Sequence, residues 1–123
     1  MRDILIVMLG GAIGTFYRYI LNNYFANLFA VSIGYGTAIA NISGSFFIGL
    51  IYGIAENNSF NPSLKLFIIV GLLGGFTTFS SFALETINFI RDGAVKKAIL
   101  YFIFNNFVGI GMAYLGILTS KLF

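Results

Sequence analysis

Four long apolar stretches constrain the fold of this chain more than any other feature. They run over residues of about 4–26, 33–55, 63–90 and 95–119. A transmembrane helix needs about 20 apolar residues to cross a hydrocarbon core of roughly 30 Å. Each stretch reaches that length, and only 9% of the residues are charged, against about 25% in a soluble domain. The sequence therefore predicts an all-α membrane protein with four transmembrane helices in a single domain, residues 1–123.

The residue types that are missing exclude several functions. The chain has no Cys and no His, so it offers no thiolate or imidazole for a metal site, a nucleophile or a base. Its basic residues are scattered and form no patch for nucleic acid. No small-residue cleavage site precedes Arg18, so we expect the first apolar stretch to be a membrane helix and not a signal peptide. We expect neither an enzyme nor a nucleic-acid-binding protein.

The third apolar stretch is too long and too irregular for one simple helix. As a single α-helix, residues 63–90 would extend about 42 Å, well beyond the hydrocarbon core. Its centre reads Gly-Gly-Phe-Thr-Thr from residue 74, and Gly and β-branched residues both weaken a helix. We predict a third helix broken near mid-membrane, with non-helical backbone at about residues 74–79. The alternative is an unbroken helix with a glycine-rich packing face.

Polar side chains inside the predicted helices need partners, because lipid offers them none. Asn41 either links two helices by hydrogen bonds or lines a pore or site. Asn105 and Asn106 lie at similar depth in the fourth helix. Glu85 either reaches the membrane interface, where a basic group can pair with it, or belongs to an ion path. Arg18 falls late in the first stretch, where its side chain can snorkel to the headgroups.

Phe79 and Phe82 are three residues apart and therefore share a helix face. Ser80 and Ser81 lie between them in the sequence. The edges of aromatic rings carry positive electrostatic potential, and hydroxyl groups donate hydrogen bonds. Such a surface suits a small anion without the tight binding of a fixed Lys or Arg, which would slow its passage. Lipid contact or ordinary core packing is the alternative.

The basic residues are divided almost evenly between the two sides of the predicted bundle. Arg2, Lys65 and Lys121 fall on one side, and Arg91, Lys96 and Lys97, with Arg18 added, fall on the other. The positive-inside rule needs an excess on one side. We therefore expect insertion in both orientations and an antiparallel homodimer with its two-fold axis in the membrane plane. Broken helices meeting at that axis would offer backbone carbonyls to Na⁺. The alternative is a weakly oriented chain fixed by a partner protein.

Three motifs resemble those of the Fluc (CrcB) family of fluoride channels. They are Gly-Gly-Ala-Ile-Gly-Thr-Phe-Tyr-Arg-Tyr from residue 10, Gly-Thr-Ala-Ile-Ala-Asn-Ile-Ser-Gly-Ser-Phe from residue 36, and Gly-Gly-Phe-Thr-Thr-Phe-Ser-Ser-Phe from residue 74. The resemblance covers the whole chain in length, helix number and motif order.

The resemblance implies a fluoride-selective channel in the inner (plasma) membrane, which exports cytosolic fluoride down its electrochemical gradient and lowers its toxicity. It also implies a dual-topology homodimer with two pores and a structural Na⁺ at the dimer interface. By motif, the residues along or near the pore would be Asn41, Phe79, Ser80, Ser81, Phe82 and Glu85. The Na⁺ ligands would be the backbone carbonyls of Gly74 and Thr77. The role of Arg18 and the pore residues of the fourth helix stay unassigned.

Two other functions fit a chain of this size. A dual-topology exporter of cationic drugs needs a membrane-buried carboxylate to exchange protons, and the first apolar stretch has none. A non-conducting scaffold subunit of a larger membrane complex needs no site at all, and it would give no ion flux when purified alone.

Overall fold

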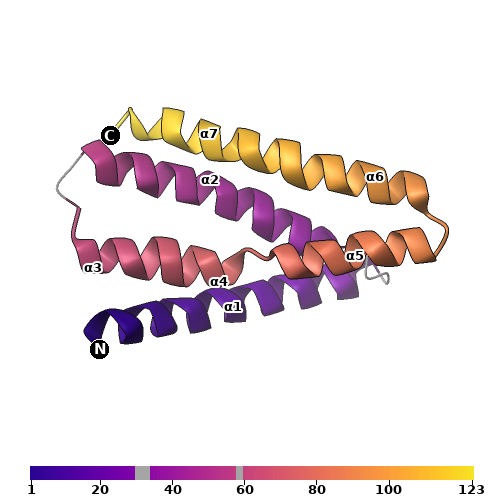
Figure 1. Ribbon diagram of the computed structural model, residues 1–123, viewed down its shortest axis with the longest axis horizontal. Helices are drawn as coiled ribbons and strands as arrows, with labels where there is room; N and C mark the ends of the chain where they lie inside the picture. The colour runs from indigo at the N-terminus through magenta and orange to yellow at the C-terminus, as the bar shows by residue number, and fades with distance from the viewer. Residues whose placement is uncertain (30–33, 58–59) are drawn as a thin grey trace.

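The computed structural model describes residues 1–29, 34–57 and 60–123, which form four helical spans (Figure 1). The first two spans are α1 (Arg2–Phe29) and α2 (Tyr35–Asn57). The third contains α3 (Pro62–Lys65), the π-helical segment η1 (Leu66–Leu73), α4 (Gly74–Phe76) and α5 (Phe79–Arg91). The fourth contains α6 (Val95–Ile103), the π-helical segment η2 (Phe104–Val108) and α7 (Gly109–Ser120).

The predicted all-helical membrane architecture is confirmed. All four spans are long and apolar enough to cross a membrane, and no strand occurs within the described ranges. The helix ends lie within a few residues of those expected from the sequence. Residue 33, where the second helix was expected to begin, lies outside the described part of the chain.

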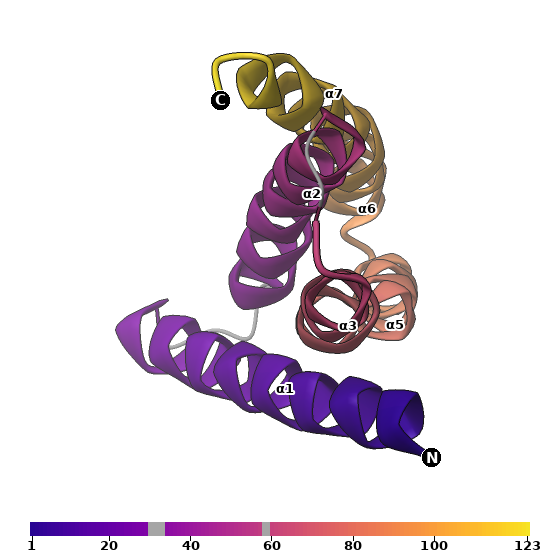
Figure 2. The same cartoon turned by 90° about the vertical axis from the view of Figure 1, so that its left-hand side faces the viewer.

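The spans alternate in direction, so the start of α1, the start of α3 and the end of α7 share one end of the molecule (Figure 1). The α5–α6 turn lies at the opposite end. α2 packs along α7, α1 packs along η1 and α4, and α5 packs against α6. Figure 2 shows α1 crossing the bundle on the side away from α7. The basic residues at the two ends are therefore Arg2, Lys65 and Lys121 against Arg91, Lys96 and Lys97.

The third span begins and ends at well-defined caps. The Asn61 side chain accepts hydrogen bonds from the backbone N–H groups of Ser63 (2.9 Å) and Leu64 (3.4 Å), and Pro62 occupies a first-turn position that needs no N–H. At the other end, Gly93 adopts a φ of +75°, which favours glycine at a helix C-terminus. The N–H of Ala94 then donates to the carbonyl of Phe89 at 2.8 Å.

Glycines allow the backbones of α2 and α7 to approach closely. A β-carbon built on Gly49 would lie 2.0 Å from the carbonyl oxygen of Ala113, and one on Gly116 would lie 2.2 Å from that of Phe46. Both atoms belong to backbone and cannot rotate away. These helices therefore associate through small residues, as is typical of packing in lipid.

We expect Gly49→Ala to lower the free energy of unfolding by about 1–3 kcal/mol or more, because the added methyl group forces two backbones apart. Gly111→Ala is the matched control, since a β-carbon there meets no atom within 4 Å. Thermal unfolding of the two variants in the same detergent measures the difference. Equal melting temperatures would show that this close approach contributes nothing to stability.

The helical backbone of the third span is interrupted at two residues. Thr77 (φ −80°, ψ 156°) and Thr78 (φ −153°, ψ 121°) are extended and lie between α4 and α5. Residues 74–76 and Phe79, expected from the sequence to be non-helical, are helical. Gly75 serves close packing instead, because a β-carbon there would lie 2.6 Å from the carbonyl oxygen of Gly11 in α1.

Candidate functional site

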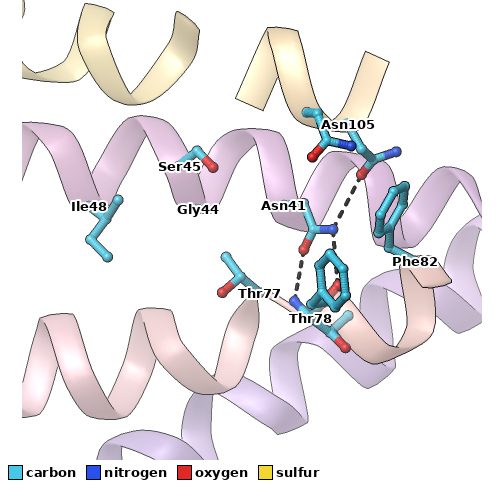
Figure 3. A pocket seen from close by; sticks show the side chains of 10 residues that line it. Asn41, Gly44, Ser45, Ile48, Thr77, Thr78, Phe82 and Asn105 are labelled. Atoms are coloured by element: carbon cyan, nitrogen blue, oxygen red, sulfur yellow. Dashed lines mark hydrogen bonds between the residues drawn. The ribbon is translucent and has the colours of Figure 1, made fainter. Parts of the chain in front are cut away.

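The side chain of Asn41 in α2 holds the interruption between α4 and α5. Its Oδ1 accepts a hydrogen bond from the N–H of Thr78 at 2.8 Å, and its Nδ2 donates to the carbonyl of the same residue at 3.1 Å (Figure 3). Because buried backbone groups require partners, the bond from the Thr78 N–H replaces the one that a continuous helix would make to Gly74. The bond to the Thr78 carbonyl is an additional contact, since Thr78 is the N-cap residue of α5. Of the two roles expected for Asn41, the link between helices is therefore present.

Asn105 in η2 extends this contact to the fourth span. Its Oδ1 accepts a hydrogen bond from Nδ2 of Asn41 at 3.2 Å, and its own Nδ2 donates to the carbonyl of Tyr101 at 3.1 Å. Asn105 is only 8% exposed. Asn106, the next residue, donates from Nδ2 to the carbonyl of Phe102 at 2.8 Å. The two adjacent asparagines thus differ, because one joins α2 to the fourth span and the other bonds within its own span.

A cavity of about 280 Å³ opens beside Asn41 (Figure 3). Its lining combines amides, hydroxyls and aromatic rings: Asn41, Gly44, Ser45, Ile48, Thr77, Thr78, Phe79, Phe82, Asn105 and Asn106. Asn41 therefore lines a cavity as well as linking helices. Ser80, Ser81 and Glu85, which the sequence grouped with these residues, do not line it.

Phe79 and Phe82 contact each other but differ greatly in exposure. Their ring centroids are 5.5 Å apart with an angle of 58° between the ring planes. Phe82 is 3% exposed and packs beside Tyr101, with 5.6 Å between ring centroids. Phe79 is 76% exposed in the single chain. Both rings border the cavity. Phe82 is also packed between α5 and α6, while Phe79 lies on a surface that this chain leaves uncovered.

The hydroxyl group of Thr78, inside the interruption, caps the start of α5. The Oγ1 of Thr78 accepts a hydrogen bond from the N–H of Ser81 at 3.3 Å and donates to the Oγ of the same residue at 3.2 Å. The Oγ of Ser80 lies 3.2 Å from Oγ1 of Thr78. In this structure the two serines therefore contribute to a helix N-terminus.

Glu85 is bound by hydroxyl groups of neighbouring helices. Thr37 of α2 donates to its Oε1 at 2.9 Å, and the Tyr101 hydroxyl of α6 donates to its Oε2 at 2.5 Å. The carboxylate thereby connects three spans. It also lines a second cavity, of about 470 Å³, with Asn88, Phe89, Arg91 and Asp92. Glu85 does not line the cavity beside Asn41. Tyr101 connects the two places, because its hydroxyl binds Glu85 and its backbone carbonyl binds Asn105, which does line that cavity.

The sequence suggested that Arg18 lies near a helix end and snorkels to the headgroups. The structure places it differently. It lies well inside α1, and its Nε donates to the carbonyl of Gly75 at 3.1 Å. Thr15 donates to the same oxygen at 3.4 Å. A cation is favourable at this point, because the last carbonyls of α4 form the negative end of a helix. Sequence reasoning missed this role because it placed Arg18 near the end of the helix. In the structure α1 continues to Phe29, and a charge that far inside a membrane helix requires a protein partner.

The interruption also releases two backbone carbonyls. In a continuous helix the N–H of Thr78 would bond to Gly74, and that of Ser81 would bond to Thr77. Both N–H groups donate to side chains instead. Carbonyl oxygens without these partners are suitable ligands for a hard cation. Across the described residues, no group of three or more His, Cys, Asp or Glu side chains is placed to hold a metal.

Comparison with known proteins gives a consistent result. Residues 5–117 match the protein family described as CrcB-like protein, Camphor Resistance (CrcB). The chain is 42% identical over 116 residues to the fluoride-specific ion channel FluC of Shewanella woodyi. It is 41% identical over 116 residues to the protein of that name from Shewanella putrefaciens. In both comparisons the alignment covers 94% of this chain and 94% of the relative.

Proposed function

This chain belongs to the CrcB family, and from that premise we propose that it is a fluoride-specific ion channel of the cell's inner (plasma) membrane. It exports cytosolic fluoride passively, down its electrochemical gradient, and so lowers fluoride toxicity. The observation that carries the proposal is the cavity beside Asn41, which combines amide and hydroxyl groups with two phenylalanine rings. Fluoride is small and holds its water tightly, so its passage requires many hydrogen-bond donors and ring edges in place of that water.

We propose the pore residues as Asn41, Phe79, Ser80, Ser81, Phe82 and Glu85. Asn41 and the two phenylalanines line the cavity itself. Ser80 and Ser81 lie directly after the interruption, and Glu85 lies one helical turn beyond Ser81 in α5, where hydroxyls from two other helices hold it. Ser80, Ser81 and Glu85 thus continue the polar groups along α5, from the interruption toward the α5–α6 turn.

We also propose that the working unit is an inverted homodimer. One ring at the cavity, Phe79, is 76% exposed, and a second copy would cover it. The distribution of basic residues also favours an inverted dimer. Because Arg18 is bound to the carbonyl of Gly75, it no longer counts among the basic residues at either end of the bundle. The count at the two ends becomes three (Arg2, Lys65, Lys121) against three (Arg91, Lys96, Lys97). With no excess at either end, the positive-inside rule gives no preferred orientation.

A structural Na⁺ at the dimer interface fits the residues present. The carbonyls of Gly74 and Thr77 would hold it, since both lack the hydrogen bonds of a continuous helix. These ligands are neutral oxygen atoms, which suit a hard monovalent cation. When bound, the ion supplies positive charge between the interrupted helices of the two subunits.

Fluoride efflux from liposomes that contain only this purified chain tests the proposed function. We expect fluoride to leave potassium fluoride-loaded vesicles once a potassium ionophore balances the charge, while chloride stays inside in a parallel preparation. Proton-driven efflux of a lipophilic cation would instead indicate a drug exporter. Absence of any flux, with the protein folded and inserted, would indicate a scaffold subunit.

A further inference from the structure

We propose that Asn105 is a displaceable hydrogen-bond acceptor: its side-chain oxygen binds an amide N–H of Asn41 until fluoride takes its place. This inference rests on the proposed fluoride channel and adds a residue of the fourth span that determines how strongly the pore holds the anion. It follows from the hydrogen bonds of Asn41, which leave no donor free for an anion.

The Asn41 side chain has two N–H hydrogens and one carbonyl oxygen to use. The oxygen accepts from the N–H of Thr78 at 2.8 Å. One Nδ2 hydrogen goes to the carbonyl of Thr78 at 3.1 Å, and the other goes to Oδ1 of Asn105 at 3.2 Å. An anion that enters the cavity therefore meets a carboxamide whose donors are both taken. It can bind Asn41 only by displacing one of these acceptors.

The two acceptors differ in how easily they can be displaced. The Thr78 carbonyl belongs to the backbone of the interruption, and the N–H of the same residue is bound to Asn41 as well. Moving it would undo both halves of the reciprocal pair. Oδ1 of Asn105 is at the end of a side chain that can rotate, and a single hydrogen bond joins this residue to Asn41. Asn105 is therefore the acceptor that yields.

The position of Asn105 supports this exchange. Its side chain borders the same cavity as Asn41, Phe79 and Phe82. Its Nδ2 donates to the carbonyl of Tyr101 in its own span, which keeps the amide oxygen directed toward α2. A buried donor without a partner is costly, so an acceptor that waits beside Asn41 stabilises the empty pore. The same acceptor competes with fluoride and weakens its binding, which favours release.

The dependence of efflux rate on fluoride concentration tests this role. Asn105→Leu removes the competing oxygen with little change in side-chain size. We expect the half-saturating fluoride concentration to fall about tenfold, the effect of one competing hydrogen bond, and the maximal rate to fall with it because release slows. Asn105→Ser, whose hydroxyl is too short to reach Asn41, should change both quantities in the same direction. A raised or unchanged half-saturating concentration in both variants would overturn the proposal.

A double-mutant cycle shows whether Asn105 acts through Asn41. In an Asn41→Ala background, Asn105→Leu should no longer change the half-saturating concentration. Asn106→Leu is the matched comparison, because this amide bonds only within its own span, and its effect should be the same in both backgrounds. A cooperative thermal unfolding transition shows that each variant is folded, although Asn41→Ala should unfold at a lower temperature because it leaves the N–H of Thr78 without its partner. If the unsubstituted chain conducts but the cycle is additive, the role of Asn105 fails alone. If the unsubstituted chain conducts no fluoride, the proposed function fails as well.

Discussion

Fluoride efflux should fall roughly a hundredfold when Phe79 and Phe82 are both replaced by isoleucine, or about tenfold for each ring. Isoleucine keeps an apolar side chain of similar bulk but has no ring edge to face an anion. Both rings line the cavity beside Asn41, so fluoride there would lose two favourable contacts. Electrode measurement of fluoride released from liposomes gives the rate, and each single substitution should fall between the double variant and the unsubstituted chain.

Replacing Phe79 and replacing Phe82 should affect stability differently. This difference distinguishes a role in conduction from a role in packing. Phe82 is buried against Tyr101 and Phe102, so Phe82→Ile should also lower the melting temperature. Phe79 is 76% exposed, so Phe79→Ile should impair efflux at nearly unchanged stability. Phe107→Ile is the control, since this ring is 71% exposed and lies outside the cavity. Normal efflux by folded Phe79→Ile would show that this ring does not contact the ion.

The helical spans were predictable from sequence because a general physical requirement fixes them. An apolar stretch in lipid must satisfy its own backbone hydrogen bonds, and a helix does so locally. The four stretches therefore became helices with ends close to those expected. The exact extent of the interruption did not follow, because a residue distant in sequence determines it. Asn41, 37 residues before Thr78, takes the N–H that would have continued the helix.

The site was also predictable only in part. Asn41, Phe79 and Phe82 belong to motifs that resemble those of fluoride channels, and in the structure they meet at one cavity. The partners of Arg18, Asn105 and Glu85 lie 57, 64 and 48 residues away, respectively. No local pattern encodes those contacts. The cost of an unpaired polar group in lipid predicts that partners exist, but only the packing of the helices shows which they are.

Biasing the orientation of the chain should remove efflux almost completely, because an inverted dimer requires both orientations. Two variants with glutamine substitutions create opposite biases: Arg91→Gln, Lys96→Gln and Lys97→Gln in one, and Arg2→Gln, Lys65→Gln and Lys121→Gln in the other. Each leaves three basic residues at one end and none at the other, an excess that the positive-inside rule converts into a single orientation. We expect each variant alone to give only background fluoride efflux.

Two combinations distinguish lost orientation from damage to the protein. Co-expression of the biased variants supplies both orientations, so we expect efflux to return. A chain that carries all six substitutions has no basic residue at either end, and Arg18 stays inside α1, bound to Gly75. Its ends are balanced again, so it should insert both ways and conduct, even though it carries every substitution of the two inactive variants. Full efflux from either biased variant alone would contradict the inverted dimer, because a chain with one orientation would then suffice to form the pore.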